Sequence, residues 1–296
     1  MKTRASGAVL VLPLVVFLVV FLLYPLCYLA ANSLVPGGGV LEGRTKQVGG
    51  WSAGQWLRTV TVENYVKLFG DGYYLSSLFH SVVLSLAVAI GSVILCIAPA
   101  WVLVRTQFPG KRLFRAVLTI PMAFSGVIVG FMIVIMLGRW GAIPAVLHWL
   151  TGEAYLSMTA YTLSGLVVAY VYFEIPRATL TLEAAIRKFD FDLDAAARSL
   201  GATLWQRLWY VLVPLLLPAI ISTVALAFAV SMGSFGVALI IAKKFNLLPV
   251  DIFLEITGYA NFEFASALCV IMLVITLTTN LYLRRIGEKR YVFKER

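Results

Sequence analysis

Long apolar stretches alternate with short polar ones along the whole chain. A helix needs about 20 apolar residues to cross the roughly 30 Å hydrocarbon core of a bilayer. Stretches that meet this requirement occupy residues 8–31, 77–104, 114–138, 159–182, 214–241 and 263–284. The pattern predicts an all-α polytopic membrane protein with six transmembrane helices, which form a single transmembrane domain over residues 1–296.

The composition agrees with a membrane protein. Hydrophobic residues make up 61% of the chain and charged residues 13%, and the mean hydropathy is +0.92. Soluble domains carry about 25% charged residues, so a water-exposed fold of this size would lack polar surface. The first stretch could instead be a signal peptide, because Lys2 and Arg4 precede it and Ala30 and Ala31 follow. Its length exceeds the 7–15 residues or so of a signal-peptide core, which favours a membrane helix.

The net charge of +10 is distributed as expected for a membrane topology. Cytoplasmic loops of membrane proteins carry an excess of Lys and Arg. With the N-terminus inside, the inner segments and adjoining helix ends hold 17 basic residues and the outer segments hold 7. We therefore expect a bacterial inner-membrane location with both termini in the cytoplasm, and no role in nucleic-acid binding.

The third inner segment, residues 183–213, contains the most informative pattern. Asp194, Ala195, Ala196, Ala197 and Leu200 belong to a helix-forming run that Gly201 can end in a left-handed cap. After Ala202, Thr203 can cap a second helix. Pro214 fits the first turn of the following membrane helix, where a missing N–H is tolerated. The pattern predicts a short cytoplasmic helix, a tight glycine turn and a helix that enters the membrane.

This segment resembles the EAA loop of binding-protein-dependent ABC importer permeases. Gly201 matches the loop glycine, Pro214 the proline thirteen residues later, and Pro218 a second proline found in many members. The resemblance implies the type I importer permease fold, with a coupling helix in this loop that docks on a cytosolic ATPase. It also implies a second permease subunit, an extracytoplasmic solute-binding protein, and ATP and Mg bound by the partner ATPase, with no cofactor in this chain.

The chain departs from the family pattern at one position. Ala195–Ala197 stand where the family has Glu-Ala-Ala, so Asp194, one residue earlier, is a possible substitute for the glutamate. A literal Glu-Ala-Ala occurs at residues 183–185, but Phe189 stands where its glycine should follow. We therefore place the ATPase-coupling loop at Gly201.

Polar residues inside the apolar stretches are candidates for the translocation path. Glu174 and Arg177 lie three residues apart in the fourth stretch, and intramembrane charges are costly unless they face a partner or a polar path. They could line the path, or simply pair with each other near the inner interface. Ser231 and Ser234 in the fifth stretch could line the path or allow close helix packing.

Several other functions conflict with the sequence. No GxxxxGK[ST] motif is present, so the chain is not the nucleotide-binding subunit. The two histidines, His80 and His148, form no HExxH, and the three cysteines have no CxxC spacing, so neither an intramembrane enzyme nor a metal site is expected. A secondary transporter would usually show internal repeats, and none is evident.

The solute is predicted from resemblance alone. The chain looks most similar to permeases of polyamine, thiamine, sulfate and phosphonate importers. Within this group a polyamine-type solute is our first expectation, with phosphonate, thiamine or an inorganic oxyanion as alternatives.

Overall fold

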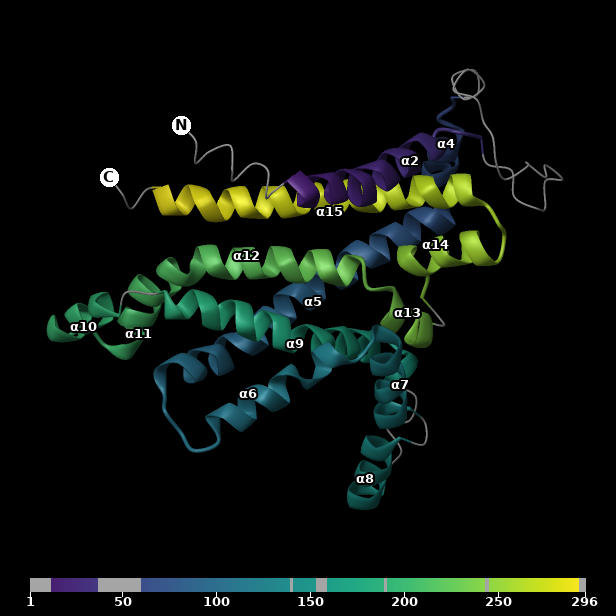
Figure 1. Ribbon diagram of the computed structural model, residues 1–296. Coiled ribbons are helices and arrows are strands. Elements are labelled where there is room, and N and C mark those ends of the chain that lie inside the picture. The colour runs from purple at the N-terminus through teal and green to yellow at the C-terminus, as the bar shows by residue number, and fades with distance from the viewer. Residues whose placement is uncertain are drawn as a thin grey trace, which may run out of the picture. The chain divides into compact units, whose positions relative to one another are not determined.

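The computed structural model describes residues 12–36, 60–138, 141–152, 159–188, 191–242 and 245–292, and within them every regular element is helical (Figure 1). The all-α prediction is therefore confirmed. Residues 1–76 and 251–274 form one compact unit, and residues 77–250 and 275–296 form a second.

The first unit contains α2 (Tyr24–Asn32), α4 (Glu63–Gly70), the first turn of α5, most of α14 (Leu248–Thr257) and the start of α15 (Phe262–Val292). The buried Asn64 side chain donates hydrogen bonds to the carbonyls of Ser33 (2.9 Å) and Val35 (2.7 Å). These bonds fix the chain that leaves α2 against α4. The Thr61 hydroxyl accepts from the Glu63 N–H at 3.2 Å, although Val62 is the residue that precedes the helix.

The second unit holds most of the helices. They are α5 (Gly72–Arg105), α6 (Lys111–Thr119), α7 (Gly126–Leu137), α8 (Ala142–Thr151), α9 (Leu163–Arg187), α10 (Asp192–Ser199), α11 (Leu204–Arg207), α12 (Val213–Met232) and α13 (Phe235–Ile241), with the C-terminal half of α15.

Helix α9 lies at the centre of the second unit. Near its N-terminal end, Leu166 and Tyr170 pack with buried residues of α5, α7 and α13. Near its C-terminal end, Leu182 and Ile186 pack with Cys96 of α5 and with side chains of α12. Helix α9 therefore packs on α5, α7, α12 and α13.

Five described helices are long and apolar enough to cross a membrane: Leu12–Asn32, Gly72–Arg105, Gly126–Thr151, Trp205–Met232 and Phe262–Gly287. Helix α9, at the fourth predicted stretch, is not one of the five, although its 25 residues would suffice in length. Glu174 and Arg177 in its middle lower its hydropathy.

Two of the predicted stretches are broken. Residues 114–138 do not form one helix: α6 ends at Thr119, a 3₁₀ turn covers Ile120–Ala123, and α7 begins at Gly126. Pro121 lacks an N–H, and the Ser125 hydroxyl caps α7 by accepting from the Ile128 N–H at 3.4 Å. The apolar segment at this place, Gly126–Thr151, contains α7 and α8, and α8 covers residues that we expected in an outer loop.

The stretch 214–241 is also broken, because α12 ends at Met232 and α13 begins at Phe235. Ser234 between them has extended backbone angles, φ −80° and ψ 94°. Its carbonyl accepts a 2.6 Å hydrogen bond from the Tyr170 hydroxyl of α9. A backbone group that the break leaves unpaired is thus satisfied by a neighbouring helix, as the interior of a membrane requires.

Candidate functional site: the coupling loop and the polar residues of α9 and α12

The glycine turn after α10 has the geometry that the sequence predicts. Gly201 has a φ of +78°, in the left-handed region. Its N–H donates to the Arg198 carbonyl at 2.9 Å, and the Ala202 N–H donates to the Ala197 carbonyl at 3.1 Å. A Cβ added at Gly201 would meet no atom within 4 Å, so backbone conformation rather than space favours glycine here.

Thr203 caps the helix that follows, also as predicted. Its hydroxyl accepts from the Gln206 N–H at 3.4 Å, while the Gln206 side-chain oxygen accepts from the Thr203 N–H at 2.8 Å. This reciprocal arrangement is a capping box. The loop is therefore a helix–turn–helix with both ends of the turn satisfied.

Pro214 lies in the first turn of α12, and the helix that Thr203 caps leads into α12, as predicted. The helical backbone runs from Leu204 through α11 and a π-helical turn, Leu208–Leu212, directly into α12. π-Helical backbone is rare and occurs mostly as a single turn inside a longer helix, as it does here. The loop is thus joined to α12 by continuous helix, with no flexible connection.

Asp194 points into the protein, and only 1% of its surface is exposed. Its two carboxylate oxygens accept from Arg207 at 2.8 and 2.6 Å, and Arg105 at the end of α5 approaches one of them to 3.3 Å. The hydrogen bonds and charge of Arg207 lower the pKa of Asp194 below its ordinary 3.8. In this chain Asp194 is therefore not an outward-facing substitute for the missing loop glutamate.

Beside the polar Asp192, Arg198 and Ser199, the exposed surface of the loop contains apolar side chains. Ala195 and Ala196 are exposed, Ala197 is half-buried, and Leu200 has 88% of its surface exposed. Trp205 is 71% exposed in the following helix. These side chains, rather than Asp194, form the surface that the loop can offer to another protein.

Glu183 begins the rejected Glu-Ala-Ala sequence and is also buried. Its carboxylate accepts from Arg187 at 2.7 and 3.2 Å and makes a further ion pair with Arg115 of α6. It therefore connects α9 to α6.

Glu174 and Arg177 pair on α9, as their spacing predicts. The Arg177 guanidinium donates to the Glu174 carboxylate at 2.8 Å and lies over the Phe173 ring, 4.5 Å from its centroid. Glu174 is 1% exposed, and within the described part of the chain its second oxygen has no hydrogen-bond partner. Arg177 keeps 24% of its side chain exposed, so the cation is the more accessible member of the pair.

Ser231 lies in the last turn of α12, and Ser234 lies in the break between α12 and α13. Ser231 is buried, and its hydroxyl has no partner among the described residues, whereas Ser234 is half-buried. Tyr170, whose hydroxyl donates to the Ser234 carbonyl, lies one helical turn before Glu174. Tyr170 could not be found from the sequence, because an isolated tyrosine in an apolar helix gives no signal.

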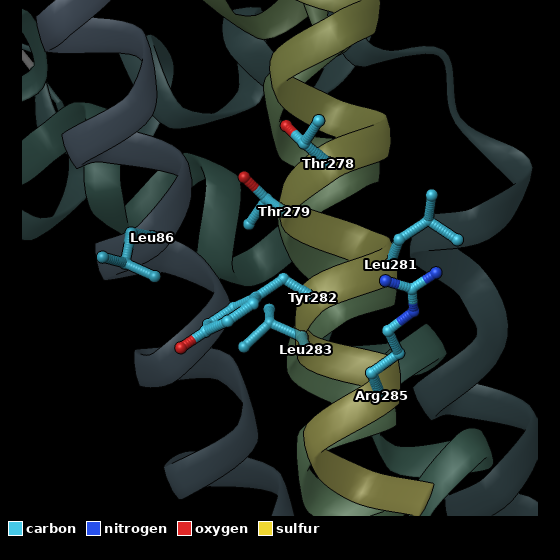
Figure 2. Close-up of a pocket in the computed structure, with 7 residues that line it drawn as sticks. All are labelled: Leu86, Thr278, Thr279, Leu281, Tyr282, Leu283 and Arg285. Carbon is cyan, nitrogen blue, oxygen red and sulfur yellow. The ribbon is translucent and has the colours of Figure 1, made fainter.

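A groove of about 700 Å³ lies elsewhere in the second unit (Figure 2). It is lined by Leu86 of α5 and by Thr278, Thr279, Leu281, Tyr282, Leu283 and Arg285 of α15. None of the candidate residues contributes to it. The described residues also contain no group of three or more His, Cys, Asp or Glu side chains that could hold a metal ion.

Residues 92–290 match the family described as "Binding-protein-dependent transport system inner membrane component". The chain is 29% identical to the sulfate transport system permease protein CysW of Synechocystis sp., over 77% of this chain and 82% of that one. It is 32% identical to the molybdenum transport system permease protein ModB of Escherichia coli K12, over 64% of this chain and 85% of that one.

The fold also resembles solved structures. A bacterial ABC transporter involved in the import of the acidic polysaccharide alginate has a chain that aligns with a TM-score of 0.75 at 17% identity. The alignment covers 97% of this chain and 96% of that chain. At this identity the likeness concerns the fold alone.

Proposed function

The chain belongs to the family of binding-protein-dependent transport system inner membrane components, and on this basis we propose that it forms the path of an oxyanion importer and docks an ATPase at the Gly201 loop. Membership makes the chain a multi-pass permease subunit of an ABC importer, and not an enzyme. The family match, which includes the loop and α9, is the observation that carries the proposal.

Docking through the loop is supported by its exposed apolar side chains. Leu200 and Trp205 are large hydrophobic side chains with most of their surface uncovered outside the core. Clustered apolar groups of this kind typically mark a protein–protein contact. The partner ATPase would bind ATP and Mg, and its closure on ATP would move α10.

Continuous helix would transmit that movement. α11, the π turn and α12 follow the Gly201 turn without interruption. A displacement of α10 would therefore reach the break at Ser234, where α12 gives way to α13. Glu174, Arg177, Ser231 and Ser234 are the residues that we assign to the path.

An inorganic oxyanion of the sulfate or molybdate class is the proposed solute. The relatives above are named for sulfate and molybdenum transport, and this favours the alternative over our first expectation, a polyamine-type solute, which they do not support. Arg177 offers a partly exposed guanidinium, the group best suited to bidentate contact with an oxyanion. In this proposal a single permease domain, with both termini cytoplasmic, pairs with a second permease or a copy of itself.

Co-purification of the tagged chain from its native membranes tests this proposal. We expect an ATPase and a permease partner to co-purify with the chain in fixed stoichiometry. We also expect a co-purified binding protein that binds sulfate or molybdate, as measured by calorimetry. Spermidine serves as the matched cationic test solute. Isolation of the chain alone would refute the importer complex, whereas binding of spermidine and neither anion would refute only the solute.

A further inference from the structure

Two buried carboxylates on the loop side of the second unit each bind two arginines from different parts of the chain. Asp194 binds Arg207 and Arg105, and Glu183 binds Arg187 and Arg115. Asp194 belongs to α10, the helix assigned to ATPase docking, so its contacts determine what moves with that helix.

The Asp194 cluster is built for a fixed geometry. Arg207 binds both carboxylate oxygens, and only 14% of its side chain is exposed. The Arg105 guanidinium lies over the Phe191 ring, 4.4 Å from its centroid, just before α10 begins. Bidentate, partly buried arginine pairs give more orientational specificity than exposed ion pairs.

The two arginines come from two different helices. Arg207 closes the short helix that leads into α12, whereas Arg105 is the last residue of α5. Asp194 therefore connects α10 to α5 as well as to α12, and the α5 connection bridges 89 residues of sequence.

We propose that Asp194 is a positioning residue that transmits the movement of the coupling loop to two helices. Its contact with Arg207 transmits the movement to α12, and its contact with Arg105 transmits it to α5. This inference rests on the proposed function, since it concerns the same loop. Without the carboxylate, α10 would still dock on the ATPase through Leu200, but α5 would no longer follow it.

The first test measures coupling in the assembled transporter. In proteoliposomes, Asp194→Asn should lower the solute imported per ATP hydrolysed by at least about fivefold, the lower end of typical coupling between sites. Glu63→Gln, at an exposed position of α4 outside the docking helix, is the control and should leave this ratio unchanged. A purely structural role would lower uptake and hydrolysis together through loss of assembled complex, and would leave their ratio intact.

A double-mutant cycle tests whether movement of the loop is transmitted to α5 as well as to α12. If both arginines act through Asp194, Arg105→Gln alone should lower the amount of solute imported per ATP hydrolysed. In the Asp194→Asn background the same substitution should cause no further loss. Additive losses, or no loss from Arg105→Gln, would overturn the α5 connection.

The second test measures position directly. Spin labels at Ser199 of α10 and Thr106 after α5, on a chain without its three native cysteines, should give a narrow distance distribution in the whole complex. Asp194→Asn should broaden it, and an unchanged distribution would refute the positioning role. Failure of the wild-type chain to recruit an ATPase would instead refute the proposed function, so the two failures are distinguishable.

Discussion

Gly126 of α7 and Gly236 of α13 meet backbone to backbone. A Cβ added at Gly236 would lie 2.7 Å from the Val127 nitrogen and 3.0 Å from the Gly126 carbonyl carbon. One turn further along α7, a Cβ at Gly130 would lie 2.9 Å from the Ile240 Cβ. Small residues allow membrane helices to approach this closely, and here they bring α13 against α7 just after the break at Ser234.

Gly236→Ala should therefore destabilise the protein by about 1–3 kcal/mol, because the neighbouring atoms are backbone and cannot move aside. The measurement is the thermal unfolding midpoint in detergent. Gly72→Ala is the control, since a Cβ there would meet nothing within 4 Å. Equal midpoints for the two variants would contradict the close approach of α7 and α13.

Gly201→Val should abolish uptake or ATPase recruitment. The left-handed backbone costs ordinary residues about 1–2 kcal/mol, and β-branched residues resist it further. Gly201→Asn should retain much of the activity, because asparagine tolerates this conformation and the site has space for a side chain. Co-purified ATPase and uptake are measured for each variant, and normal uptake with valine would refute the coupling role of the turn.

Glu174→Gln should slow oxyanion uptake by roughly tenfold, equivalent to about 1.4 kcal/mol. The substitution keeps the shape of the side chain but leaves the Arg177 charge without its counter-charge, so that a passing anion would be held more tightly. Glu63→Gln, at an exposed position of α4, provides the control. Unchanged uptake at normal expression would mean that Glu174 and Arg177 only neutralise each other.

The pH dependence of stability should reveal the Asp194 cluster. Arginine lowers the pKa of Asp194 in the folded protein, so the stabilisation is fully present above the ordinary value of 3.8 and is lost as the pH falls through the folded-state pKa. The difference in unfolding midpoint between wild type and Asp194→Asn should stay constant from about pH 8 to 5 and shrink below about pH 4. A difference that already shrinks near pH 6 would contradict this assignment.

Local patterns in the sequence were enough to predict the geometry of the Gly201 turn and the charge pair of α9. The left-handed glycine, the Thr203 cap and the Glu174–Arg177 pair depend on residues within a few positions of one another. Such interactions are determined by helical spacing and by the φ preference of glycine.

The direction of the Asp194 side chain could not be predicted in the same way. Its partners lie 13 and 89 residues away, and nothing in the run of alanines indicates them. The breaks at Pro121 and Ser234 were missed for a related reason. Hydropathy averages over about 19 residues, whereas a break involves only a few.

The charge pair in α9 has a consequence for how the protein is made. A charged residue at the centre of an inserting helix costs about 2.5–3.5 kcal/mol, so α9 is the segment least able to enter the lipid phase by itself. The ion pair and the packing of α9 on α5 and α12 can offset that cost only once those neighbours are present. During biogenesis α9 should therefore remain close to the translocon until α12 has been synthesised, and the two helices should then pass into the bilayer together.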